Sequence, residues 1–248
     1  MFRYALLSAL VVISVGRPAT ADVIIDSFDT AYTLAANAGM NSASFGSSAI
    51  GGETDVGLMA MNGQVSVESD FDGQGLLRYQ QGLLVSSITE IVWDGTDSDP
   101  GNLASNGLGG VDLTSGGTDT GIQYTIRSLD TFVNLLFIAY SPSGDSSILT
   151  ALAGPISTAS SNAPSSVFVP FGDFTPSSGS GADFQNIGAL ELNITSPFAT
   201  VLDIAEIRST AKPIPAPAAA PLLAIGLTLL LARWFAARPR QRSTRRVT

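Results

Sequence analysis

The sequence predicts an all-β protein, an antiparallel β-sandwich or jelly roll, and three observations lead to this prediction. Residues 122–127 and 190–195 alternate between apolar and polar side chains, which is the period of a strand with one buried face. Gly, Asn, Asp and Ser separate such segments roughly every 8–15 residues, as turns do in sandwiches and barrels. Residues 22–210 show no helical period.

Each predicted strand rests on the pattern of apolar and polar residues in its own segment. Val65 and Val67 alternate with polar neighbours and predict a short strand. Residues 132–140 are apolar almost throughout and rich in β-formers, which is typical of a central strand and predicts that Leu136 is almost fully buried. The remaining strands are expected, in chain order, at residues 23–28, 56–61, 76–79, 88–93, 147–152, 167–171 and 201–207. Residues 154–181 are rich in Ser, Pro and Gly and predict long loops around 167–171.

The ends of the chain predict export. Residues 1–21 combine a positive start, an apolar core and the small residues Ala19-Thr20-Ala21; this is the pattern of a secretory signal peptide cleaved before Asp22 by signal peptidase. The ectodomain then covers 22–211. A proline-rich linker follows at 212–218, an apolar helix at 219–237 and a basic tail at 238–248. Such a helix is slightly short for a bilayer, and its arginines predict a cytoplasmic tail.

The C-terminal segments resemble the PEP-CTERM class of bacterial sorting signals. The resemblance rests on the motif Ile214-Pro215-Ala216-Pro217-Ala218, the short apolar helix and the arginine cluster, in that order. It is closest to Pro-x-Pro-Ala variants, with Ala216 where the commonest pattern has glutamate. The resemblance implies recognition by an exosortase and export linked to extracellular polysaccharide. An unprocessed membrane anchor is the alternative on physical grounds alone.

The ectodomain is similar to galactose-binding-type jelly rolls that often precede this signal. Four segments carry the similarity: the opening residues 23–29, the Gly-Val-Asp-Leu stretch at 110–117, residues 168–174, and residues 181–192. The similarity implies the fold. It does not imply a ligand, because many functions share one fold.

Composition excludes several kinds of chemistry. The chain has no cysteine and no histidine, so disulfides, cysteine nucleophiles, Ser–His pairs and His-ligated metal sites are excluded. Residues 22–212 contain four basic and 21 acidic residues, which leaves a net charge of −17. This charge repels nucleic acid and favours cations or neutral sugars as partners. Solubility outside the cell is the alternative explanation of the acidity.

One loop has the composition of a cation site. Asp94, Asp97, Asp99 and Asn102 lie within nine residues, directly after a predicted strand, and oxygen ligands of this kind suit Ca²⁺ in a structural role. The spacing is not that of an EF-hand. A second, lesser candidate is Asp70-Phe71-Asp72-Gly73. A solvated turn is the alternative for both, since Asp, Asn and Gly are turn formers.

Two carboxylate pairs and one tryptophan complete the candidates. Glu90 with Asp94, and Asp203 with Glu206, are close enough in sequence to suggest acid–base hydrolysis, although exposed strand carboxylates are the alternative. Trp93 adjoins the acidic loop and suggests a sugar-binding edge, or else a core residue.

The function expected is a non-enzymatic cell-surface or extracellular-matrix protein. A carbohydrate-binding module is the alternative, and a carboxylate-pair glycoside hydrolase is the third hypothesis.

Overall fold

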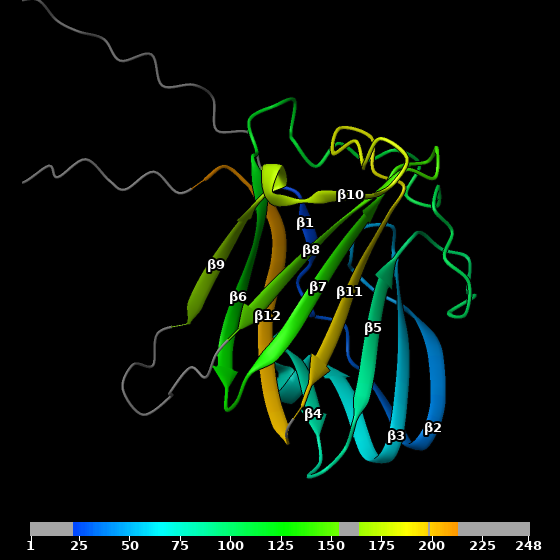
Figure 1. Ribbon diagram of the computed structural model, residues 1–248, viewed down its shortest axis with the longest axis vertical. Helices are drawn as coiled ribbons and strands as arrows, with labels where there is room; N and C mark the ends of the chain where they lie inside the picture. Colours follow the sequence, from blue (N-terminus) through cyan, green and yellow to red (C-terminus); the bar gives the residue numbers. More distant parts are fainter. Residues whose placement is uncertain (1–21, 154–163, 198, 213–248) are drawn as a thin grey trace, which may run out of the picture. The chain divides into compact units, whose positions relative to one another are not determined.

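The computed structural model describes residues 22–153, 164–197 and 199–212 (Figure 1). The predicted signal peptide, the proline motif and the apolar C-terminal segment lie outside this part of the chain. Within the described ranges, no helix is both long enough and apolar enough to span a membrane.

The described residues form a 12-stranded antiparallel sheet that curls around one core. This confirms the all-β antiparallel prediction. The only helices among them are two single 3₁₀ turns, η1 (Phe71–Gly73) and η2 (Phe171–Asp173). The strands are β1 Ile24–Asp26, β2 Tyr32–Gly46, β3 Glu53–Ser69, β4 Leu77–Gln81, β5 Ser87–Trp93, β6 Gly121–Leu129, β7 Val133–Tyr140, β8 Ser146–Ala153, β9 Ser165–Pro170, β10 Thr175–Ser178, β11 Ala189–Ser196 and β12 Thr200–Thr210.

Strand β3 carries the sheet from one layer of the sandwich to the other. Its residues 55–60 pair with β5, whereas its residues 65–68 pair with β4. The first layer therefore has the order β10-β8-β7-β11-β5-β3, and the second β3-β4-β12-β6-β9. The sequence predicts two separate strands here. The structure corrects this to one continuous strand, because β2 pairs with β3 along almost its whole length.

The core lies between the two layers and consists of one apolar cluster. Trp93, Tyr79 and Tyr124 are the largest of its fully buried side chains. The rings of Tyr124 on β6 and Phe137 on β7 lie 5.5 Å apart and join the layers. Because the chain has no cysteine, this buried apolar surface supplies the stabilisation that disulfides supply in many exported domains.

Strands β2 and β10 are not predicted by the sequence. Strand β2 consists largely of Ala, Asn, Gly and Ser, which have little intrinsic preference for strands. Its pairing with β3 decides its conformation, as tertiary contacts often do. Strand β10 is four exposed residues at the edge beside β8.

Strand β7 is central, as predicted, but Leu136 is not in the core. β7 pairs with β8 on one side and β11 on the other. Val133, Leu135, Phe137 and Ala139 are buried, whereas Leu136 is only partly buried. Strand residues alternate between faces, so Leu136 lies on the face of the first layer that points away from the core. The expectation of almost full burial is therefore wrong.

Candidate functional site

The face of the first layer that points away from the core, hereafter the outer face, carries a mixture of carboxylate, amide and apolar side chains. The strand registers place its residues in rows that run across β3, β5, β11 and β7. One row is Asp55, Val92, Glu191 and Ile138. The next is Gly57, Glu90, Asn193 and Leu136.

A cleft of about 570 Å³ opens on this face. Its floor is formed by strands β2, β3 and β5, and part of its wall by Pro100 and Gly101 from the loop after β5. Gly57 leaves space in the floor, and a Cβ atom built there would lie 3.4 Å from Glu90 Oε2. The lining residues are Met40, Asn41, Ser42, Gly57, Leu58, Met59, Ile88, Glu90, Pro100 and Gly101.

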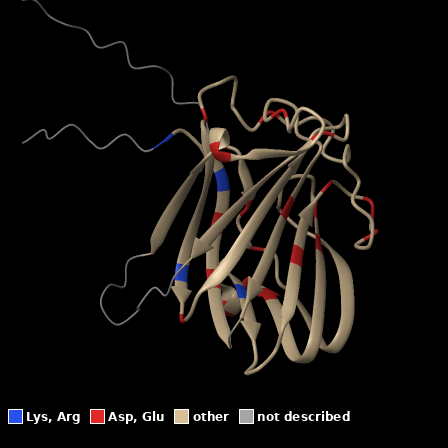
Figure 2. Cartoon of the chain, viewed as in Figure 1, with Lys and Arg blue, Asp and Glu red and all other residues tan. Residues whose placement is uncertain are grey.

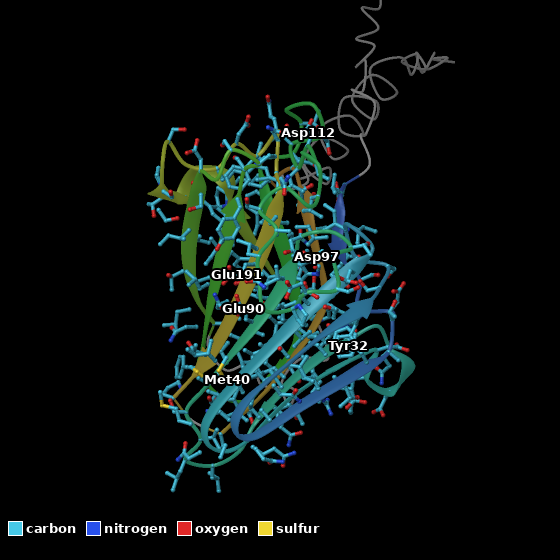
Figure 3. All side chains as sticks on the ribbon, turned by 90° about the vertical axis from the view of Figure 1, so that its right-hand side faces the viewer. Tyr32, Met40, Glu90, Asp97, Asp112 and Glu191 are labelled. Atoms are coloured by element: carbon cyan, nitrogen blue, oxygen red, sulfur yellow. The ribbon has the colours of Figure 1, made fainter. Side chains whose placement is uncertain are left out.

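Glu90, at the cleft, forms a carboxyl pair with Glu191 of the neighbouring strand (Figure 3). The Tyr140 hydroxyl donates to Glu191 Oε2 over 2.7 Å, and the Asn193 amide donates to Glu191 Oε1. Burial and, second, the negative charge of the neighbouring Glu191 raise the pKa of Glu90. Glu90 therefore holds its proton more tightly than a free glutamate does, because a second carboxylate nearby disfavours its charged form.

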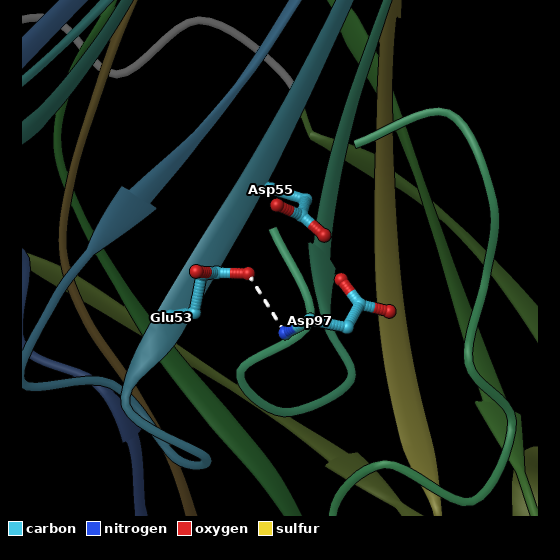
Figure 4. A group of neighbouring side chains, drawn as sticks. All are labelled: Glu53, Asp55 and Asp97. Atoms are coloured by element: carbon cyan, nitrogen blue, oxygen red, sulfur yellow. Dashed lines mark hydrogen bonds between the residues drawn. The ribbon is translucent and has the colours of Figure 1, made fainter. Parts of the chain in front are cut away.

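An acidic cluster, formed by Glu53, Asp55 and Asp97, lies where β3 meets the loop after β5 (Figure 4). One carboxylate oxygen from each residue lies within 4.8 Å of the others, which is close enough to hold a metal ion. Glu53 and Asp55 are 5% and 3% exposed, whereas Asp97 is at the surface. In Figure 4 the carboxylates of Asp55 and Asp97 turn towards one another.

Backbone hydrogen bonds attach the loop to β3 at this cluster. The N–H groups of Asp97 and Ser98 donate to Glu53 Oε1 over 3.2 and 2.8 Å. Asp55 has no such backbone donor in the structure. Burial raises the pKa of Asp55 to about 6. The nearby negative charges of Asp94, Glu53 and Asp97 add to this rise, and the Ser44 side chain opposes it.

Asp94 begins the same loop and is 1% exposed. Its Oδ2 accepts the backbone N–H of Ala104 over 2.6 Å, which folds residues 94–104 back on themselves. Burial is the largest cause that raises the pKa of Asp94, and the charges of Asp97 and Glu53 add to it. Oδ1 of Asp94 and Oδ1 of Asp55 are both buried without a hydrogen-bond partner.

The structure separates the four predicted cation ligands into two groups. Asp97 lies in the acidic cluster, and Asp94 acts electrostatically on Asp55. Asp99 and Asn102 are exposed and bond to each other, with Asn102 Nδ2 donating to Asp99 Oδ2 over 2.8 Å. Those two residues thus form a local turn, which is the alternative that the sequence left open.

Sequence reasoning did not find Glu53 and Asp55. They lie about 40 residues before the loop, and only the pairing of β3 with β5 brings them beside it. The available signal was the pair of carboxylates two residues apart at the start of a strand, which places both on one face.

The lesser candidate, Asp70-Phe71-Asp72-Gly73, forms a turn. Asp70 Oδ1 accepts the N–H of Gly75 over 3.0 Å, and residues 71–73 form η1. Asp70 and Asp72 both adopt positive φ angles near 55°, which aspartate tolerates better than most residues. The turn-forming alternative accounts for both residues.

Trp93 is a core residue and does not offer a surface to a ligand. It is 1% exposed, and its indole N–H donates to Asp26 Oδ2 over 2.9 Å. The sugar-binding role considered for Trp93 is therefore corrected to the core alternative. On the outer face, Tyr140 at the end of β7 is an aromatic side chain that is partly exposed.

The carboxylate pairs considered for hydrolysis are not built as pairs. Asp203 accepts two hydrogen bonds from Arg78 over 2.7 and 2.8 Å. Glu206 lies 3.3 Å from Arg208. Glu90 is paired with Glu191 rather than with Asp94, and sequence could not show this because the partners are about 100 residues apart.

The acidic residues lie on the loop after β5, on neighbouring strands and on other loops, with few basic residues among them (Figure 2). In the part of the chain that the structure describes, the ion pairs involve only Arg78 and Arg208. The acidic cluster is thus not neutralised by a basic side chain.

No known protein family and no curated protein matches the chain. Solved structures that resemble it include a family 11 carbohydrate-binding module from a cellulosomal cellulase of Clostridium thermocellum. That module is 11% identical with a TM-score of 0.40, and the match covers 80% of this chain and 99% of the module. A family 11 carbohydrate-binding module from Clostridium thermocellum in complex with a β-1,3-1,4-mixed-linked tetrasaccharide is 11% identical with a TM-score of 0.39, over 78% of this chain and 97% of the module.

An agarase is 13% identical with a TM-score of 0.40, over 60% of this chain and 22% of the enzyme. Similarities at this level assign neither a ligand nor an activity to this chain.

Proposed function

We propose that this chain is an exported, non-enzymatic carbohydrate-binding protein whose ligand occupies the cleft on the outer face. The observation that carries the proposal is the cleft itself, which combines carboxylate and amide groups with apolar side chains on a rigid sheet. Sugars need this combination, because each ring has polar edges and apolar faces. Of the two non-enzymatic functions that the sequence suggests, the carbohydrate-binding module is the one that this cleft supports.

The polar groups of the site are held in place before a ligand arrives. Beside Glu90 of the cleft, Glu191 accepts hydrogen bonds from Tyr140 and Asn193, which fixes the orientation of that carboxyl. Groups that are already oriented lose little conformational entropy on binding. The exposed Met40 and the half-exposed Ile88 supply apolar surface beside them. A neutral glycan fits best, because the net charge of −17 repels acidic polysaccharides.

The same carboxyl pair is poorly arranged for glycoside hydrolysis. Glycosidases hold their two carboxyls about 5–5.5 Å apart for retention or about 6.5–9.5 Å apart for inversion, because the sugar or a water lies between them. Glu191 is only 7% exposed, and both of its carboxyl oxygens already accept hydrogen bonds, from Tyr140 and Asn193. The proposal therefore assigns Glu90 and Glu191 to binding.

Export and sorting belong to the same proposal. The signal peptide at 1–21, the motif Ile214-Pro215-Ala216-Pro217-Ala218 and the basic tail together support processing by signal peptidase and an exosortase. Calcium enters as a structural ion, because the acidic cluster offers only oxygen ligands.

Binding of the protein to an array of neutral oligosaccharides tests the proposal, with the mixed-linked tetrasaccharide among them. The decisive variant is Gly57→Val, which fills the floor of the cleft with a side chain that strands accommodate well. We expect a loss of binding of at least about tenfold, and a melting curve of the variant checks that it is folded. The matched control is Thr125→Val on β6 in the other layer. Equal binding by Gly57→Val and the wild type would place the ligand elsewhere.

A further inference from the structure

Pro100 and Gly101, which form part of the cleft wall, lie three and four residues after Asp97 of the acidic cluster. Asp97 and Ser98 bond through their N–H groups to Glu53, and Pro100 and Gly101 line the cleft. The position of this wall thus depends on how the loop is held against β3.

The loop is held by groups of the same charge. Glu53, Asp55 and Asp97 place carboxylate oxygens within 4.8 Å of one another, and no basic residue of the described ranges pairs with them. Carboxylates at this separation repel one another unless a proton or a cation lies between them. This repulsion opposes the two backbone hydrogen bonds that attach the loop to β3, and a cation between the carboxylates would remove it.

Two buried oxygen atoms point independently to a missing partner. Oδ1 of Asp55 and Oδ1 of Asp94 have no hydrogen-bond partner, although Asp55 is 3% and Asp94 1% exposed. Buried carboxylate oxygens are almost always paired, because desolvation without a partner costs free energy. Asp94 lies outside the three-residue cluster, and its negative charge acts on the carboxyl of Asp55.

We propose that Ca²⁺ binds to Glu53, Asp55 and Asp97 beside Asp94, and that this ion holds the loop as the wall of the cleft. A hard cation with six to eight oxygen ligands suits a site composed of carboxylates and open to water at Asp97. The second half of the proposal rests on the proposed carbohydrate-binding function. It makes binding of the glycan dependent on calcium.

The first test is a calorimetric titration of CaCl₂ into the full chain after treatment with chelator, together with melting curves in calcium and in chelator. An ion that binds only the folded state stabilises it, and at a hundred times its dissociation constant we expect the melting temperature to rise by roughly 5–10 °C. Identical curves and no heat of binding would overturn the cation site.

The variants are Asp55→Asn and Asp97→Asn, with Asp99→Asn as the matched control from the same loop. Neutral asparagine relieves the repulsion, so the first two variants retain their fold without calcium. We expect both to lose the calcium heat and the melting shift, and Asp99→Asn to keep them. If Asp55→Asn and Asp97→Asn retain the wild-type calcium response, the assigned ligands are wrong.

The second test measures the affinity for the best neutral oligosaccharide from the array in calcium and in chelator. We expect at least a tenfold weaker affinity in chelator for the wild type, and no calcium effect for Asp97→Asn. An affinity that calcium does not alter overturns the coupling, although the ion still binds. If calcium gives heat and a melting shift but no array oligosaccharide binds in either condition, the carbohydrate-binding function fails and the cation site stands.

Discussion

Leu135 and Leu136 are adjacent leucines on opposite faces of the central strand β7, and their replacement by alanine tests the layering of the fold. Leu135 is 0% exposed and packs in the core between the layers. Leu136 lies on the outer face and is only partly buried. The two substitutions are chemically identical, so any difference in stability reports on burial.

The expected magnitudes follow from the burial. Removing three buried carbon atoms at Leu135 costs about 0.8 kcal/mol each in transfer free energy, plus a cavity term, which places the loss at about 3–4 kcal/mol. Leu136→Ala removes partly solvated atoms and leaves no closed cavity, so its cost should stay near 1 kcal/mol. A domain of this size has only about 5–15 kcal/mol of stability in total.

Urea denaturation followed by tryptophan fluorescence measures both changes, because Trp93 is in the same core. With a slope of about 2 kcal/mol/M, Leu135→Ala should lower the midpoint by about 1.5–2 M, and Leu136→Ala by about 0.5 M. Equal midpoints, or a larger loss for Leu136→Ala, would mean that β7 is shifted by one residue and that the outer face is misassigned.

Three further predictions concern charge and processing. The raised pKa of Glu90 means that the folded state holds its proton more tightly than the unfolded chain; stability is therefore lost as pH rises from about 4.5 through the folded-state pKa. Glu90→Gln should flatten this pH dependence of stability in melting curves. The change should be less than about 1 kcal/mol, because solvent screens the group. A pH dependence equal to that of the wild type would contradict the pairing of Glu90 with Glu191. Asp203→Ala removes the partner of Arg78 and should cost about 1–3 kcal/mol in urea denaturation. Glu206→Ala breaks an ion pair in which both side chains are about one-third exposed, and it should cost under about 1 kcal/mol; similar losses would count against the first ion pair. Mass spectrometry of secreted protein should show a chain that begins at Asp22 and lacks the arginine tail, and full-length chain confined to the membrane would refute the processing.

The sequence predicts most of the strands because their signal is local. In β6 and β11 the apolar side chains recur every second residue, and a strand with one buried face has the same period. The long strand β2 carries no such signal. Its Ala, Asn and Ser residues become a strand through pairing with β3, which is a property of the neighbour.

The same distinction between local signals and distant contacts applies to the candidate site. The sequence identifies the oxygen-rich loop at Asp94 and Asp97, because that composition is local. It does not separate Asp99 and Asn102, which bond to each other, from Asp97, which joins the acidic cluster, since turn formers and cation ligands are the same residue types. It does not find Glu53 and Asp55, or the pairing of Glu90 with Glu191, because strand register decides which distant carboxylates meet.

By itself, the sequence determines the fold class, the acidity, the chemistry excluded by the absence of histidine and cysteine, and the prediction of export. The tertiary structure decides which face of each strand is buried, that Trp93 belongs to the core, and that carboxylates from β3, β5 and β11 share the outer face. The physical reason is that periodicity and composition act over a few residues, whereas a binding cleft requires side chains that are distant in sequence. Only the pairing of strands brings those side chains together.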